Sequence, residues 1–136
     1  MPISEAVVAE VVARVSESMK DPSYAQLAVG GFVQAQPHIS QYLSAKAARI
    51  GGAQSVVHIV FHAEVMAECF RHGQDKHVDD VVVEYRSLDR ASRGDVMAEF
   101  QKREPALSSY VASNVDEEPL RLELCRIGLA FAFARE

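Results

Sequence analysis

The side chains best suited to bind a metal ion lie on one predicted helix, which spans residues 53–72. This helix carries three histidines and a cysteine within an arc of about 80°, at about 100° per residue: His58, His62, Cys69 and His72. Two histidines at positions i and i+4 can bind the same ion, and a thiolate or a third imidazole can complete a zinc or iron site. Cys69 and His72 lie about 16–21 Å from His58 along the helix axis, which is too far for one ion. A metal ion would therefore use His58 and His62 with further ligands from another helix, or His72 with His77 from the following loop. The alternative is that these histidines line a mostly apolar helix and bond to neighbouring carbonyl or carboxylate oxygens.

Other catalytic and cofactor motifs are absent from the sequence. There is no His-Glu-x-x-His zinc motif, no pair of Glu-x-x-His motifs, no Gly-x-Ser-x-Gly elbow and no phosphate-binding glycine loop. All five histidines fall between positions 38 and 77, whereas a globin-like haem ligand is expected in the second half of the chain. The carboxylates at positions 116–118 are typical of a solvated helix start rather than of an acid–base pair. No cofactor is expected.

The two cysteines are typical of a protein from a reducing compartment. Cys69 and Cys125 are 56 positions apart, and each lies in an apolar run with helical periodicity. Buried, reduced thiols are the usual state of such residues in cytosolic proteins. No secretory signal is predicted, and no run reaches the roughly 18 apolar residues that a membrane span requires. We therefore expect a soluble, cytoplasmic protein with no membrane partner.

Length and charge restrict the class of protein further. The chain has 136 residues and a net charge of −5, so we expect a single domain over residues 1–136. A protein that binds a nucleic-acid duplex normally presents a basic face. Here the densest basic run, residues 86–103, also contains three acidic residues. No nucleic-acid partner is expected.

Apolar residues recur at helical spacing along the whole chain. Serine, proline and glycine mark the ends of the segments, and the predicted helices cover about 4–20, 22–36, 37–50, 53–72 and 78–88, a short segment around 96–100, and segments starting near 105 and 117. This pattern predicts an all-α fold, a compact orthogonal bundle of seven to eight short helices. The alternative is a short α-solenoid-like array, which the similar spacing of prolines at the two ends of the chain suggests.

Two of the predicted helices should be buried on more than one side, because apolar residues occupy several of their faces. These are the helix over 53–72 and the last helix of the chain. The side chains expected in the core are Val60, Phe70, Leu124 and Phe131. We also expect a close helix contact at Gly31, which shares a face with Ala28 and Ala35.

Two functions fit these features. The first is a non-catalytic helical protein-interaction module, an adaptor, a regulator or an immunity-type inhibitor, because catalytic motifs are absent and an acidic surface can attract a basic partner. Its expected partner is a protein, and a second copy of the chain in a homodimer is one option. The alternative is a metal- or small-ligand-binding helical bundle centred on His58 and His62, with an enzyme among the options.

Overall fold

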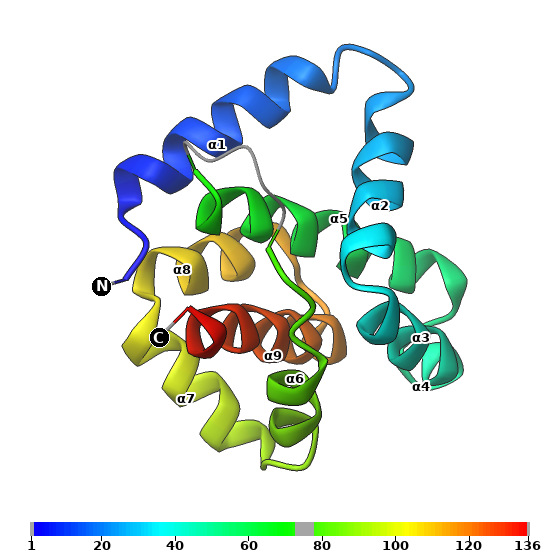
Figure 1. Cartoon of the computed structure of the whole chain (residues 1–136), viewed down its shortest axis with the longest axis vertical. Coiled ribbons are helices and arrows are strands. Elements are labelled where there is room, and N and C mark those ends of the chain that lie inside the picture. Colours follow the sequence, from blue (N-terminus) through cyan, green and yellow to red (C-terminus); the bar gives the residue numbers. More distant parts are fainter. Residues whose placement is uncertain (1, 73–77, 136) are drawn as a thin grey trace.

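The structure is a computed structural model that describes residues 2–72 and 78–135. Within these ranges the chain forms no strand and nine α-helices: α1 (Glu5–Ser18), α2 (Tyr24–Ala35), α3 (Pro37–Ala45), α4 (Ala47–Ile50), α5 (Ala53–Phe70), α6 (Val82–Asp89), α7 (Arg93–Arg103), α8 (Pro105–Asn114) and α9 (Glu118–Ala134). Figure 1 shows the helices crossing at steep angles, with α2 running across α5. The prediction of an all-α bundle is confirmed.

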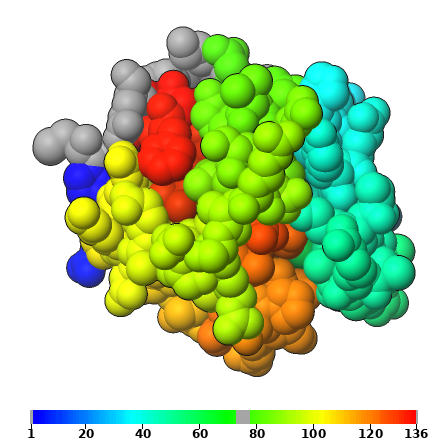
Figure 2. All heavy atoms as spheres, turned by 90° about the horizontal axis from the view of Figure 1, so that it is seen from below, coloured from blue at the N-terminus to red at the C-terminus, as the bar shows by residue number. Residues whose placement is uncertain are grey.

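Helix α9 is the centre of the bundle, and α5, α6, α7 and α8 all pack against it. Ten of its 17 residues are buried. Figure 2 shows α9, in orange and red, on both sides of the band formed by α6 and α7. The first helix, α1, contacts α5 and α8. In a solenoid each repeat contacts only its neighbours, so these long-range contacts show that the solenoid alternative is wrong.

The core contains three of the four side chains expected there. Val60, Leu124 and Phe131 are each at most 2% exposed. Phe70 is half-buried and packs its ring against that of Phe131, with 5.6 Å between the ring centroids. None of the described helices is both long and apolar enough to cross a membrane.

Side chains and special backbone conformations define the helix ends. The hydroxyl oxygen of Ser4 accepts a hydrogen bond from the backbone N–H of Val7 and caps α1, as expected of serine at this position. Prolines stand in the first turns of α3, α8 and α9, where a missing N–H does no harm. Gly51 ends α4 with a φ of 113°, a left-handed conformation that favours glycine.

Two predicted boundaries in the first half of the chain were wrong. The helix expected over 37–50 is broken at Lys46, which separates α3 from α4 and buries its side chain against α6 and α9. The second helix begins at Tyr24 rather than at Pro22. The carboxylate of Asp21 accepts hydrogen bonds from the backbone N–H and the hydroxyl of Ser23, which closes a turn ahead of the helix.

The amide of Gln36 explains why α6 begins at Val82 rather than near residue 78. Gln36 is 1% exposed and stands between α2 and α3. Its Nε2 donates to the carbonyl oxygens of Val78 and Asp79, and its Oε1 accepts from the N–H of Val81. These bonds satisfy backbone groups that a helix through 78–81 would otherwise use, so the segment stays outside the helix.

Glu104 holds the two ends of the described chain together. Its Oε1 accepts a hydrogen bond of 2.8 Å from the N–H of Ile3, and its Oε2 lies 3.7 Å from the guanidinium of Arg135. Burial raises the pKa of this carboxyl, while the Ile3 N–H and Arg135 oppose that shift. The termini accordingly lie on the same side of the molecule in Figure 1.

The close helix contact occurs at Gly128 of α9 and not at Gly31. A Cβ at Gly31 would meet no atom within 4 Å, so the expectation of close packing there was wrong. A Cβ at Gly128 would lie 2.5 Å from Cε1 of Phe100 and 3.3 Å from Sδ of Met66. Both of these side chains are fully buried. Gly128 therefore lets α7 and α5 approach α9 closely.

Gly128→Ala should lower the free energy of unfolding by about 1–2 kcal/mol, because the strain of overpacking exceeds the gain of about 1 kcal/mol in helix propensity. Gly31→Ala is the matched control and should raise stability by up to about 1 kcal/mol, since its Cβ has free space. Urea denaturation of both variants checks this. A Gly128→Ala protein more stable than the parent would contradict the packing described.

Candidate functional site

His58 and His62 lie next to each other, as the helical spacing predicts. Their rings meet edge to face with 4.6 Å between centroids. His58 is exposed, whereas His62 is 8% exposed. The Nδ1 atom of His62 lies 2.7 Å from the hydroxyl oxygen of Tyr110 on α8, within hydrogen-bonding distance. One ring nitrogen of His62 is therefore already bonded to the protein.

The other expected metal ligands lie away from this pair. Cys69 is buried, and the Nε2 atom of His72 is 2.8 Å from a carboxylate oxygen of Glu10 on α1. His77, the second ligand of the other predicted site, lies outside the described residues. Within 2–72 and 78–135, no three side chains of His, Cys, Asp or Glu come together as a metal site would require. Metal binding at His58 and His62 stays a prediction.

The environment of His62 keeps its imidazole neutral near pH 7. Burial, with a smaller contribution from the neighbouring His58, lowers the pKa of His62 to about 4. A neutral imidazole can accept a hydrogen bond at one nitrogen and donate at the other. The contact with Tyr110 thus suits a neutral ring that joins α5 to α8.

The cysteine thiols are poor nucleophiles at neutral pH. Burial raises the pKa of Cys69 to about 12 and that of Cys125 to about 11. A reactive cysteine requires a lowered pKa, because the thiolate is the attacking species. Both side chains are at most 5% exposed. They behave as apolar core residues.

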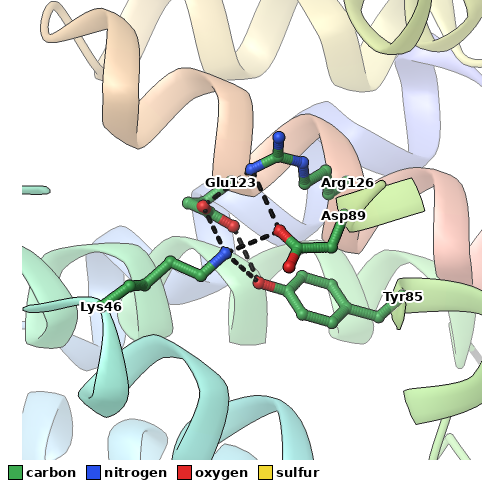
Figure 3. Close-up of polar contacts among 5 residues, drawn as sticks. All are labelled: Lys46, Tyr85, Asp89, Glu123 and Arg126. Atoms are coloured by element: carbon green, nitrogen blue, oxygen red, sulfur yellow. Dashed lines mark hydrogen bonds and ion pairs between the residues drawn. The ribbon is translucent and has the colours of Figure 1, made fainter. Parts of the chain in front are cut away.

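A buried cluster of charged side chains joins three parts of the chain that sequence reasoning did not connect (Figure 3). At its centre is Lys46, 7% exposed, between α3 and α4. Its ammonium nitrogen lies 2.7 Å from Oδ1 of Asp89 and 2.9 Å from Oε2 of Glu123. It also donates to the hydroxyl oxygen of Tyr85, at 3.1 Å. All three ammonium hydrogens thus have an acceptor.

Tyr85, Glu123 and Arg126 also make hydrogen bonds to one another within this cluster. The Tyr85 hydroxyl donates to Oε1 of Glu123 at 2.8 Å, and Arg126 Nη1 lies 2.9 Å from Oε2 of the same carboxylate. Burial, and then the negative charge of Glu123, raise the pKa of Tyr85 well above its usual value. Tyr85 therefore stays a neutral hydrogen-bond donor. Among the described buried side-chain nitrogen and oxygen atoms, the Nε of Arg126 alone lacks a hydrogen-bond partner.

A surface pocket of about 260 Å³ opens onto this cluster between α4, α6 and α9. Its lining includes the cations Lys46, Arg49 and Arg126 and the carboxylates Asp89 and Glu123. The two carboxylates oppose the entry of an anion, and the three cations oppose the entry of a metal ion. The cluster is therefore better suited to holding the helices together than to binding a charged ligand.

The third feature is the outer face of α2, formed by Gln26, Leu27, Gly30, Val33 and Gln34. All five residues are exposed, with Leu27 69% and Val33 41% exposed. Only Phe32 of this helix is fully buried. From position 22 to position 45 the chain contains no Asp, Glu, Lys or Arg, so α2 and α3 carry none of these charges. An uncharged helix with one face open is unusual on a surface that is otherwise rich in charge.

The charged cluster and the uncharged face of α2, which sequence reasoning missed, can both be related to patterns in the sequence. Lys46 ends the run without Asp, Glu, Lys or Arg that begins at Pro22. Glu123 and Arg126 interrupt the apolar pattern of the last helix three positions apart. An isolated charge in an apolar segment indicates a buried partner. The sequence does not show, however, which charges pair.

Lowering the pH from 7 to 5 should destabilise the protein through His62. The unfolded chain binds a proton there near pH 6.5, whereas the folded protein binds it only near pH 4, so the free energy of unfolding falls as the pH falls through this window. The expected loss is about 2 kcal/mol, and His62→Gln should lack it. Denaturation curves of both proteins at pH 7 and pH 5 measure the difference. Equal losses in both would contradict the buried, neutral state of His62.

The same variant tests the metal prediction. Binding of Zn²⁺ at His58 and His62 would stabilise the wild-type protein by about 4 kcal/mol at a thousandfold excess over the Kd, and His62→Gln would not respond. Because no third side chain of His, Cys, Asp or Glu among the described residues lies with this pair, we expect Zn²⁺ to leave the melting temperature of both proteins unchanged.

Lys46→Met should lower the free energy of unfolding by about 3–5 kcal/mol, because it removes the central cation and leaves the negative charges of Asp89 and Glu123 with Arg126 alone to balance them. Lys20→Met is the matched control. Lys20 also pairs with a glutamate, Glu17, but both side chains are more than 70% exposed, so the loss should stay below about 1 kcal/mol. Urea denaturation of the two variants compares the effects. Similar losses would show that the buried cluster contributes no more than a surface ion pair.

The described part of the chain thus presents a histidine pair closed by a tyrosine, a buried charged cluster and an uncharged helix face. The first two features are defined by contacts within this chain, and the third by its exposure. Comparisons of the chain with protein-family models, with curated proteins and with solved structures found no match.

Proposed function

We propose that this protein is a non-catalytic protein-interaction module and that the outer face of α2 is its binding surface. The observation that carries the proposal is the contrast between the composition of α2 and its burial. Helix α2 has no charged residue, as buried helices often have none, yet it lies at the edge of the bundle. A helix that is apolar on all sides normally has every side covered.

The chemistry of this face matches the centre of a protein interface. Interface cores are depleted in charged residues, because a charge must lose its water when the partner binds. The outer face of α2 exposes Leu27 and Val33 between uncharged amides. Glutamine side chains at its edges can exchange hydrogen bonds with water for hydrogen bonds with a partner. Such a face can be covered at little cost in desolvation.

The reactive groups of the core support a non-catalytic role. The thiols of Cys69 and Cys125 are protonated at neutral pH, and Tyr85 stays neutral within its cluster. Lys46 donates all three of its hydrogens to neighbouring side chains. These groups are engaged in holding the fold together. The alternative function, a metal- or ligand-binding bundle at His58 and His62, has weaker support because no third metal-ligating side chain among the described residues lies with the pair.

Leu27→Lys should abolish partner binding without unfolding the protein, because it places a charge on the uncharged face. The experiment immobilises the wild-type protein and the variant, exposes both to lysate of the source organism, and quantifies the retained proteins by mass spectrometry. We expect the wild type to retain one partner, which is either a different protein or a further copy of this chain. The amount of this partner retained by the variant should be at least tenfold lower.

Val83→Lys is the matched control. Val83 is 74% exposed on α6, so the same change introduces the same charge on a different surface. This variant should retain the partner as the wild type does. Retention that is equal for all three proteins would overturn the proposal, and circular dichroism shows whether each variant is folded.

A further inference from the structure

The outer face of α2 reads almost the same in both directions about Gly30. Three positions before this glycine lies Leu27 and three positions after it lies Val33, both apolar and exposed. Four positions before it and four after it lie Gln26 and Gln34, both exposed amides. At 100° per residue, all four side chains fall within about 60° of the direction of Gly30. The face is therefore symmetric in chemistry about one point.

This symmetry suits an antiparallel pair of identical helices. In a twofold interface the same patch is used on both subunits, and residue i meets j as j meets i. If the twofold axis passes beside Gly30, Leu27 lies level with the partner's Val33 along the helix pair. In the same arrangement Gln26 lies level with the partner's Gln34, so amide can bond to amide. Each level of the helix pair thus holds either two apolar side chains or two amides.

Gly30 itself permits the close approach of the two helices. It is exposed, and a Cβ added to it would meet no atom of its own chain within 4 Å. Small residues at a helix crossing let the backbones approach and the flanking side chains interlock. The glycine stands at the centre of the face, where the crossing point would lie.

Electrostatics also favours a second copy over a charged partner. The chain has a net charge of −5, so two copies repel each other least when they meet through a surface that keeps their charged side chains apart. Helices α2 and α3 carry no Asp, Glu, Lys or Arg. Near a twofold axis any charge would face its own copy, which is destabilising. An uncharged face avoids this repulsion, whereas it offers a basic or acidic partner nothing to pair with.

We propose that the partner of the outer face of α2 is a second copy of this chain, bound as an antiparallel α2 pair with its twofold axis at Gly30. This proposal rests on the proposed function, and it names the partner of the same surface. A single helix pair buries less than the roughly 1,600 Å² of a standard interface. The dimer is therefore weak, with a Kd on the order of 100 µM.

Sedimentation velocity between 10 µM and 1 mM tests the association. The wild-type protein and Val83→Lys should shift from monomer to dimer over this range, and Leu27→Lys should weaken association at least tenfold. Gly30→Leu separates assembly from folding. Its side chain has free space in the monomer and should not lower the melting temperature, but it should weaken association at least tenfold by forcing the helices apart.

Cysteine cross-linking tests the register. Gly30→Cys should form a disulfide-linked dimer on mild oxidation, because both copies of this position lie at the axis. Gln26→Cys should not, since its two copies would be about 12 Å apart along the helices, beyond the reach of a disulfide. The native cysteines are buried and provide a low background. A cross-link through position 26 but not through position 30 would overturn the antiparallel arrangement.

The two proposals fail in different ways. If the chain stays monomeric at 1 mM while Leu27→Lys still abolishes retention of another protein, the second copy is not the partner. The proposal of an interaction module is then still supported. A dimer that is insensitive to Leu27→Lys and Gly30→Leu also overturns the α2 pairing. A monomer that retains no partner through α2 overturns both proposals.

Discussion

The buried ammonium group of Lys46 determines how α6 and the α3–α4 pair sit on α9. Moving a charge out of water costs several kcal/mol, and only well-placed acceptors offset this. Here the acceptors come from Tyr85 and Asp89 on α6 and from Glu123 on α9. Because these three side chains must all reach the same nitrogen, the helices can pack in only one register. The break of the chain between α3 and α4 follows from the same requirement, since Lys46 turns its side chain into the bundle.

Helical periodicity was sufficient to predict the fold class, because it depends on residues close together in sequence. Proline and glycine positions located the starts of α3, α8 and α9 and the end of α4 for the same reason. The errors arose where a residue far along the chain competes with local preference. Gln36 holds the backbone of Val78 to Val81 from more than 40 positions away. No local pattern carries that information.

The candidate site divides in a similar way. The neighbouring positions of His58 and His62 follow from helix geometry and were predicted. The burial of His62 against Tyr110 depends on how α8 packs, and 48 positions separate the two residues. The outer face of α2 could be recognised only after its exposure was known, because an uncharged helix is equally consistent with a fully buried one.

The contact between Glu104 and the N–H of Ile3 has a consequence for the order in which the protein forms on the ribosome. The two residues are 101 positions apart, so the amino-terminal end cannot settle until Glu104 has been synthesised and has emerged. At 5–20 residues per second this takes about 5–20 s. During that interval α5 is completed before α8, so the valine-rich side of α1 stays partly uncovered until α8 has formed. We expect the nascent chain, unlike the folded protein, to expose an aliphatic segment of the kind that chaperones bind.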